Sequence, residues 1–276
     1  MIRGLFNVIE GVETSDGAGV KLRRIIGGPE LNMFDPFLLF DEFGSDNPDD
    51  YMAGFPAHPH RGFETVTYML NGKFKHKDSS GNEGVLTDGS VQWMTAGRGV
   101  IHSEMPEKTD GLARGFQLWL NLPKNLKMID PAYNDIHPDD IPCVLIKQGE
   151  VKVISGTFNG VEGPGRPHTG MFYFDIKLNA GGFIEFPVED FWNTFIYVYS
   201  GSANIENRKV YKGQLGLFKD SGMVKFSAED SSNLRCVVIG GEPLNEPVAR
   251  GGPFVMNTKA EIMKAFSDYQ DGVLTK

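Results

Sequence analysis

The sequence has little cysteine, little histidine and an excess of negative charge. Its two cysteines, Cys143 and Cys236, lie in apolar runs, which indicates buried, reduced thiols and not a disulfide framework. The formal net charge is −9. An acidic chain is repelled by phosphate backbones, so we expect no direct nucleic-acid binding. The compact basic cluster Lys21, Arg23 and Arg24 is typical of a solvated strand face.

Long apolar runs are also missing. No run approaches the roughly 20 residues that a helix needs to cross a bilayer, so we expect no membrane span. The first apolar stretch is interrupted by Glu10 and Glu13 and lacks the features of a signal peptide. The sequence therefore predicts a cytoplasmic protein.

Turn residues are abundant, with 34 glycines and 16 prolines, and they separate many short strand patterns. The segment 66–72 ends at Asn71-Gly72, a hairpin signal, and Asp88-Gly89 marks another turn. The segment 114–123 alternates, with Phe116, Leu118 and Leu120 on one face. Residues 124–142 are polar and proline-rich, which favours a linker. A helix is expected over about 258–270, capped by Asn257 or Thr258.

The two halves resemble each other. The strand-like segment 66–72 matches 196–201, and each is followed by a second turn, at Asp88-Gly89 and at Lys212-Gly213. A duplicated unit of short antiparallel strands predicts an all-β fold of two barrels or sandwiches. We expect an N-terminal domain over 1–130 and a C-terminal domain over 138–276 that includes the final helix.

Two short segments carry the residues suited to chemistry. His58 and His60 stand at i and i+2 in one, and His102 and Glu104 do so in the other. Residues at i and i+2 of a strand point to the same face. If the two strands are neighbours inside a barrel, three imidazoles and one carboxylate converge. These donors suit Fe(II), Mn, Ni, Cu or Zn, and four of them would leave two positions open on a six-coordinate ion but saturate a tetrahedral one.

The remaining histidines have weaker signals. We expect His76 to lie in a solvated hairpin, His137 in the linker and His168 in a glycine- and proline-rich loop.

The motif segments HPHRGFETVTYMLNG and DGSVQWMTAGRGVIHSEM resemble the two cupin motifs, and their residues are more similar still to those of the pirin family. The segments GFQLWLNLP and GPFVMNT resemble pirins too, so the resemblance covers nearly the whole chain. It implies two stacked cupin barrels, with one divalent metal ion in the N-terminal one. Fe(II) is favoured, and Ni, Mn, Cu, Co and Zn are alternatives. The implied ligands are His58, His60, His102 and Glu104. Glu64 stands where many other cupins place their carboxylate ligand, and we expect it beside the site instead.

The repeat also suggests that the C-terminal barrel is metal-free. When the halves are aligned on their turn glycines, the ligand positions fall on Pro187, Glu189, Phe226 and Ala228. The only histidine of that half is His168, and no ligand set can be assembled around it.

Two classes of function follow from the resemblance. The first is a quercetinase-type dioxygenase that cleaves flavonols such as quercetin with O₂ and releases carbon monoxide, with Glu104 as the catalytic base. Phe55, Phe63, Trp93, Met94, Gln117 and Trp119 are candidate pocket walls, and Gln92, Ser103 and Gln117 are candidate partners of the ligating histidines. The second is a metal- or redox-dependent regulator that binds a protein partner without turnover, and a redox sensor would need the same site. We expect a monomer or a weak oligomer.

Overall fold

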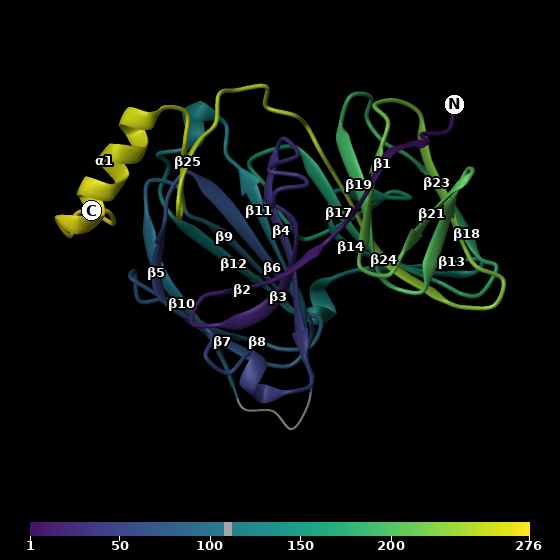
Figure 1. Cartoon of the computed structure of the whole chain (residues 1–276), viewed down its shortest axis with the longest axis horizontal. Helices are drawn as coiled ribbons and strands as arrows, with labels where there is room; N and C mark the ends of the chain where they lie inside the picture. Colours follow the sequence, from purple (N-terminus) through teal and green to yellow (C-terminus); the bar gives the residue numbers. More distant parts are fainter. Residues whose placement is uncertain (108–111) are drawn as a thin grey trace. The chain divides into compact units, whose positions relative to one another are not determined.

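The computed structural model describes residues 1–107 and 112–276, which are almost entirely β (Figure 1). Two compact units form within it. The histidine unit comprises residues 12–27, 37–138 and 244–276, and the phenylalanine unit comprises residues 1–11, 28–36 and 139–243. None of the helices in the described ranges is long and apolar enough to cross a membrane.

The histidine unit is built from two antiparallel sheets. The seven-stranded sheet has the order β12 (Ala132–Ile136), β9 (Val91–Thr95), β6 (Phe63–Asn71), β11 (Ala113–Asn121), β4 (Phe37–Ser45), β3 (Val20–Ile26) and β2 (Val12–Asp16). The four-stranded sheet has the order β5 (Phe55–His60), β10 (Val100–Pro106), β7 (Phe74–Asp78) and β8 (Glu83–Leu86). Two short 3₁₀ helices, η1 (Pro48–Asp50) and η2 (Lys124–Leu126), lie in its loops.

The phenylalanine unit repeats this arrangement. Its seven-stranded sheet has the order β1 (Leu5–Glu10), β22 (Gln214–Phe218), β19 (Asn193–Ser200), β24 (Leu234–Gly241), β17 (Met171–Leu178), β14 (Gly149–Ser155) and β13 (Cys143–Ile146). Its four-stranded sheet has the order β18 (Phe183–Pro187), β23 (Met223–Ala228), β20 (Ser202–Ile205) and β21 (Arg208–Tyr211). A small hairpin joins β15 (Thr157–Phe158) to β16 (Val161–Glu162), and η3 (Pro138–Asp140) precedes β13. The predicted duplication is confirmed.

Chain ends are exchanged between the two halves of the sequence. Strand β1, at the N-terminus, pairs with β22 of the phenylalanine unit. Residues 244–276 belong to the histidine unit and contain β25 (Ala249–Gly251), β26 (Phe254–Met256) and helix α1 (Lys259–Gln270). Each compact unit is thus made of separate stretches of the sequence. The expected domains 1–130 and 138–276 are each one continuous stretch, and they stay a prediction.

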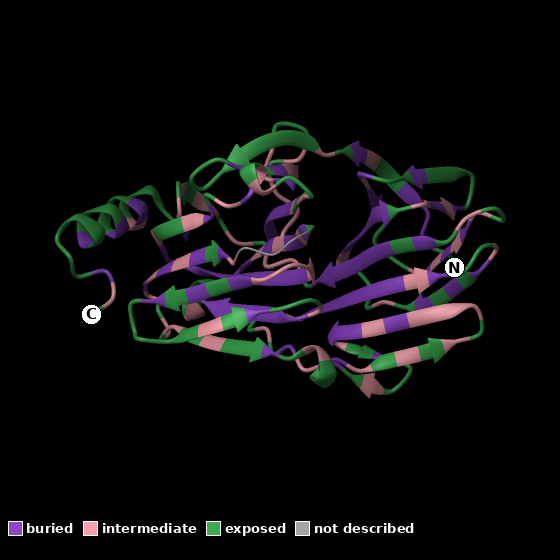
Figure 2. Ribbon diagram, turned by 90° about the horizontal axis from the view of Figure 1, so that it is seen from below, coloured by how far each residue is buried: buried purple, intermediate pink, exposed green. Residues whose placement is uncertain are grey.

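Helix α1 begins where the sequence indicates. Thr258 is its N-cap and forms a capping box with Glu261, because each side chain accepts a hydrogen bond from the other residue's backbone N–H. Ile262 and Ala265 are buried, but Met263 is 69% exposed. Only some of the apolar residues of the helix therefore pack in the core, and Figure 2 shows exposed residues along much of the helix.

Three other local expectations need correction. Asn71-Gly72 is not a hairpin turn, because β6 lies in the seven-stranded sheet whereas β7 lies in the four-stranded one; Asp88-Gly89 is a turn, as predicted, and it joins β8 of the four-stranded sheet to β9 of the seven-stranded one. The predicted linker contains β12, which pairs with β9 at the sheet edge through backbone hydrogen bonds that need no strand-forming side chains. Both cysteines are free thiols, but Cys143 is exposed, since its strand β13 is itself an edge strand.

The phenylalanine unit has an apolar interior. Side chains from both of its sheets form one core, in which β18 contributes Ile184 and Phe186 and β23 contributes Val224 and Phe226. These two strands stand in the four-stranded sheet as β5 and β10 do in the histidine unit. Their inward positions offer no metal-binding atom, which supports the prediction of a metal-free C-terminal barrel.

Candidate metal centre

The two histidine-bearing segments form neighbouring strands. Strands β5 and β10 pair antiparallel, with His102 directly opposite His58 and Val100 opposite His60. A β-bulge follows His102, so that Glu104 pairs with Phe55. The sequence-based expectation that the two i, i+2 pairs meet on one sheet is confirmed for the histidines.

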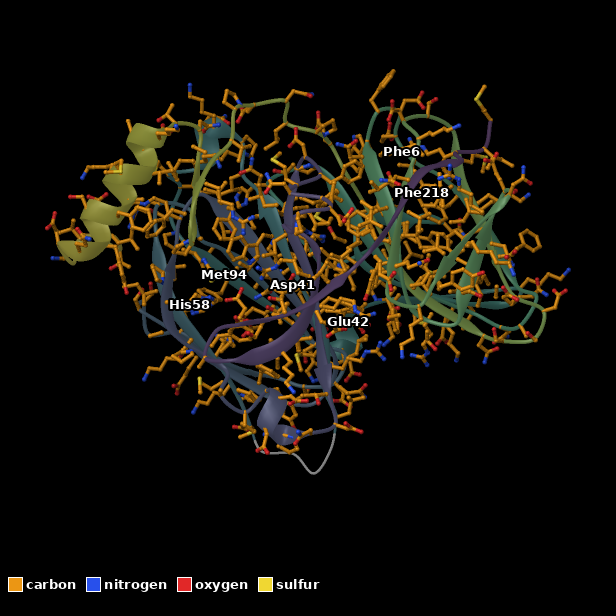
Figure 3. All side chains as sticks on the ribbon, viewed as in Figure 1. Phe6, Asp41, Glu42, His58, Met94 and Phe218 are labelled. Carbon is orange, nitrogen blue, oxygen red and sulfur yellow. The ribbon has the colours of Figure 1, made fainter. Side chains whose placement is uncertain are left out.

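The three imidazoles converge. One ring nitrogen from each of His58, His60 and His102 can be chosen so that all three lie within 4.8 Å of one another. The Nε2 atoms of His58 and His102 are 3.1 Å apart. His60 is 3% exposed and His102 is 1% exposed, while His58 is half-buried. Figure 3 labels His58 in this sheet.

Hydrogen bonding and burial keep these rings available as ligands. The Nδ1 of His58 lies 2.8 Å from the carbonyl oxygen of Pro56, so Nδ1–H donates there and Nε2 keeps its lone pair. Burial, followed by the nearby charges of His102 and His58, holds the pKa of His60 well below its usual range. Burial also lowers the pKa of His102 to about 3, and His58 adds to this effect. Both rings are therefore neutral at neutral pH.

Glu104 is buried and forms part of a polar network. Its Oε1 lies 3.1 Å from Thr67 Oγ1, and its Oε2 accepts a hydrogen bond of 3.4 Å from Gln117 Nε2. Burial raises the pKa of Glu104, while His58 and the Thr67 hydrogen bond oppose that shift. Thr67 Oγ1 is also 2.8 Å from Gln117 Oε1. Since a hydroxyl has a single hydrogen, Thr67 can donate to only one of these two oxygens.

This donor set fits a divalent metal ion. Neutral imidazole nitrogens and a carboxylate are the ligands that Fe, Mn, Ni, Cu and Zn accept. The Nε2 atoms of His58 and His102 lie 3.1 Å apart, and the Pro56 contact leaves the lone pair on His58 Nε2. A shared ion would accept electron pairs from both nitrogens. The three histidines can hold such an ion. Glu104 as its fourth ligand stays a prediction.

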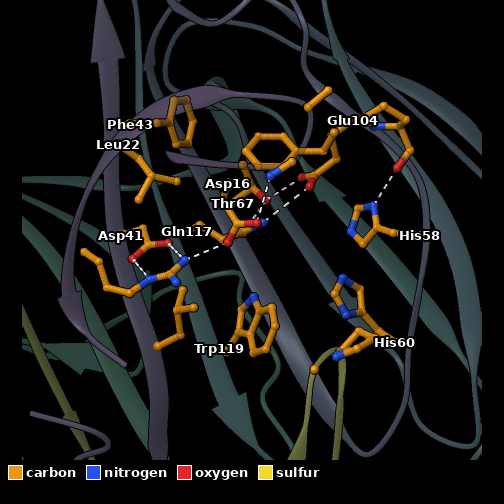
Figure 4. A pocket seen from close by; sticks show the side chains of 18 of the residues that line it. Asp16, Leu22, Asp41, Phe43, His58, His60, Thr67, Glu104, Gln117 and Trp119 are labelled. Atoms are coloured by element: carbon orange, nitrogen blue, oxygen red, sulfur yellow. Dashed lines mark hydrogen bonds and ion pairs between the residues drawn. The ribbon is translucent and has the colours of Figure 1, made fainter. Parts of the chain in front are cut away.

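A cavity of about 810 Å³ opens beside these residues, between the two sheets of the histidine unit (Figure 4). Its volume is that of a site for a drug-sized molecule. His58, His60 and Glu104 line it together with apolar side chains. The larger apolar side chains of the lining are Leu22, Leu39, Phe43, Phe55, Phe74 and Trp119.

The predicted walls are placed as follows. Phe55, Gln117 and Trp119 line the cavity. Phe63 is fully buried and packs against Trp119 and His60, with ring centroids 4.4 and 5.1 Å apart. Trp93 and Met94 are core residues, at 3% and 0% exposure.

The side chains predicted to bond to the ligating histidines bond to other groups instead. Gln117 bonds to Glu104, Gln92 donates to Asp135, and Ser103 donates to the Lys77 carbonyl. The acceptor that orients His58 is a backbone carbonyl, which side-chain types cannot reveal.

His76 does not lie in a solvated hairpin, contrary to expectation. It is 2% exposed, its Nε2 lies 2.8 Å from Asp135 Oδ2, and its ring stacks on Tyr133 with centroids 5.7 Å apart. Glu64 is fully buried and accepts a hydrogen bond of 2.8 Å from Thr95. His137 and His168 are exposed.

Several cavity residues were missed by the sequence-based reasoning. Thr67, Arg24, Asp41 and Arg250 all line the cavity. Arg24 was assigned to a solvated face, yet it pairs with Asp41, which is buried. Alternation along β3 places Leu22 and Arg24 on one face, so the strand period predicts that Arg24 points to the same side as Leu22. Arg250 has no such local signal.

Comparison with known proteins agrees with the geometry. The family model described as "Pirin" matches residues 19–120, and the "Pirin C-terminal cupin domain" matches residues 173–275. A Pseudomonas aeruginosa protein whose name assigns it provisionally as a quercetin 2,3-dioxygenase is 46% identical, over 99% of this chain and 98% of its own. The pirin of Rattus norvegicus is 42% identical, over 94% and 89% of the two chains.

Among solved structures, a quercetin 2,3-dioxygenase from Acinetobacter baumannii superposes with a TM-score of 0.91. It is 32% identical, and 99% of each chain is covered. The two units are thus cupin domains, as the resemblance implied. The chain belongs to the pirin family.

Proposed function

We propose that this protein is a metal-dependent dioxygenase of the quercetinase type, which cleaves flavonols such as quercetin with O₂ and releases carbon monoxide. The observation that carries the proposal is the cavity of about 810 Å³ into which His58, His60 and Glu104 open. The names of the Pseudomonas and Acinetobacter relatives support the same reaction. A regulator without turnover would need a protein-binding surface but no substrate-sized cavity at the metal ligands.

His58, His60, His102 and Glu104 would hold the ion. The chemistry supplied by a bound divalent ion, with Fe(II) favoured and Ni, Mn, Cu, Co or Zn as alternatives, is Lewis-acid polarisation of the substrate oxygen. The half-buried His58 leaves that side of the centre accessible from the cavity. The neutral rings of His60 and His102 add no positive charge that would compete with it.

Glu104 is the proposed catalytic base. Burial raises the pKa of Glu104, which brings its basicity closer to that of a phenolic or enolic hydroxyl. Once it has accepted the substrate proton, its carboxyl group can donate to Thr67 Oγ1, which then donates to Gln117 Oε1 at 2.8 Å. The network therefore holds the proton at a fixed position and keeps both side chains satisfied.

The apolar lining positions the substrate. Trp119 presents a ring to the cavity, and its indole lies edge-on to His60 with centroids 5.3 Å apart. Since Phe63 and Arg250 pack over the Trp119 ring, a flat aromatic molecule in the cavity would meet the edge of this ring, next to the ligating histidines. Phe55 and Phe43 line the cavity too and exclude water from the bound ring.

The test is to purify the protein anaerobically, measure its bound metal, and follow quercetin absorbance and carbon monoxide after adding O₂. We expect metal-dependent loss of the flavonol band with carbon monoxide release, and neither in a His58→Ala/His60→Ala variant. Glu104→Gln should retain part of the metal and lose turnover. Stoichiometric metal without turnover would refute the dioxygenase proposal in favour of the regulator, and unchanged turnover in Glu104→Gln would remove Glu104 as the base.

A further inference from the structure

The cavity has a second polar end, away from the histidines. Arg24 donates to Asp41 through Nε at 3.0 Å and Nη2 at 2.8 Å, and its Nη2 also donates to Asp16 at 2.7 Å. Figure 4 shows Asp41 and His60 on opposite sides of the pocket, with Thr67 and Gln117 between them. A molecule that reaches from the histidines across the cavity meets these charged groups.

Arg250 joins this end from the C-terminal segment. Its guanidinium lies over the Trp119 ring, 5.0 Å from the centroid, and its Nη1 donates to the Leu38 carbonyl at 3.2 Å. The same Trp119 ring contacts His60. Arg250 and His60 therefore contact the same indole, so a flat ligand in the cavity beside Trp119 lies near both.

The charges of this end balance. Two guanidinium groups, on Arg24 and Arg250, face the carboxylates of Asp16 and Asp41, and Arg250 is electrostatically linked to the other three. Asp41 is held on both oxygens by Arg24, whereas the Asp16 side chain is 54% exposed. The accessible groups are thus the donors of Arg250 and the acceptor oxygens of Asp16.

The donors of Arg250 and the acceptor oxygens of Asp16 together select a neutral ligand group that both donates and accepts hydrogen bonds. A phenolic hydroxyl does so, since it carries one hydrogen and two lone pairs. A substrate carboxylate would also attract Arg250, but it would face the Asp16 and Asp41 carboxylates and lose that gain to repulsion. An unsubstituted ring would use neither the remaining donors of Arg250 nor the remaining lone pairs of Asp16, so it would gain nothing from this end of the cavity.

We propose that this end of the cavity is a subsite for the hydroxyl groups of a polyhydroxylated aromatic ring, in which Arg250 donates to one hydroxyl and Asp16 accepts from one. This inference rests on the proposed function, because it names the part of the flavonol that points away from the metal. The specificity is for vicinal phenolic hydroxyls on the distal ring.

The test measures binding without turnover. Iron-loaded protein is titrated anaerobically with 3-hydroxyflavone, 3,3′,4′-trihydroxyflavone and 3-hydroxyflavone-4′-carboxylate, and Kd is read from tryptophan fluorescence and calorimetry. We expect the trihydroxy ligand to bind about tenfold more tightly than 3-hydroxyflavone, as one to two net hydrogen bonds allow. We expect the carboxylate to gain less.

Variants separate Arg250 from a general charge effect. Arg250→Met keeps the length of the side chain and its packing on Trp119 but removes the donors, so the tenfold ratio should fall to about two. Arg250→Lys should give an intermediate ratio, because it has the charge without the planar fork. Arg23→Met removes an equal charge from a side chain that pairs with Glu13, and it should leave the ratio unchanged.

Each other result overturns the inference. Equal affinities for the two neutral ligands, or a preference for the hydroxylated ligand that is unchanged in Arg250→Met, would show that the subsite does not recognise hydroxyl groups through Arg250. A carboxylate ligand that binds most tightly would make this end an anion site. If none of the three flavonols binds, the proposed function fails together with the subsite, whereas the first three results leave it standing.

Discussion

The close approach of the C-terminal segment to Gly62 can be tested with a matched pair of glycine substitutions. Gly62, two residues after His60, has φ +90°, and a Cβ there would lie 2.0 Å from the Val255 carbonyl oxygen. Gly81 has φ +89°, and no described atom lies within 4 Å of its would-be Cβ. Gly62→Ala and Gly81→Ala therefore share the same backbone strain, about 1–2 kcal/mol, but only the first forces a neighbour to move.

The added cost at Gly62 follows from what holds Val255. Its N–H donates to the Arg61 carbonyl at 3.0 Å, and its carbonyl accepts from Lys127 Nζ at 3.0 Å. Moving this backbone away loses both bonds in a buried place, which costs about 3 kcal/mol beyond the strain. For a unit of this size that corresponds to a Tm roughly 6–12 °C below that of Gly81→Ala.

The assay is thermal unfolding of both variants with and without metal, together with metal content per chain. We expect Gly62→Ala to have the lower Tm and less bound metal, because the shift reaches the end of strand β5 that carries His60. Equal Tm values and equal metal contents for the two variants would refute the argument that this contact supports the metal centre.

Three further predictions concern the same unit. The pKa of His102 is lowered to about 3 from an unfolded value of 6.5, so between these values the unfolded state binds more protons and acid favours unfolding. The metal-free protein should thus lose stability from pH 6.5 downward, and His102→Gln should flatten this dependence in pH-dependent urea unfolding; an unchanged slope would contradict it. Lys127→Met should cost about 3 kcal/mol, because the buried ammonium donates to Gly62, Asn121 and Val255 oxygens at 2.7–3.0 Å; a loss below 1 kcal/mol in urea unfolding would count against it. Asp268→Asn leaves Arg61, which is 4% exposed, without its ion pair at 2.8 Å. It should lower Tm by several degrees, whereas Asp271→Asn, at the exposed C-cap of the same helix, should not.

Much of the metal centre could be predicted because its information is local. The spacing of His58 and His60, and of His102 and Glu104, needs only the period of a strand to place each pair on one face. Pairing of β5 with β10 then brings the three histidines together. The duplicated strand pattern likewise predicted two similar β units, and the capping residue predicted the start of helix α1.

Some errors could have been avoided with the same rule. In KFKHKD, Phe74, His76 and Asp78 alternate with exposed residues, and the structure buries all three. The flanking lysines suggest a solvated hairpin, whereas the period of two predicts one buried face. Lysines on the outer face are compatible with a buried histidine on the inner face.

Other features lie beyond sequence reasoning of this kind. Arg250 reaches the cavity because residues 244–276 return to the histidine unit, and Trp119, which it contacts there, is far away in sequence. The turns at Gly72 and Gly89 were identified as turns, but no local signal states whether the next strand joins the same sheet. Such choices depend on how the whole unit closes.

The exchange of chain ends has a consequence for biosynthesis. A ribosome releases the strands with His58, His60 and His102 early, but Arg250, the Val255 contact to Gly62 and helix α1 come from residues 244–276. Until those residues emerge, the sheets that carry the histidines lack their C-terminal support, and one side of the cavity has no wall. A complete site for the metal therefore needs residues 244–276, and a nascent chain stalled before residue 244 should bind metal less tightly than the chain that includes them.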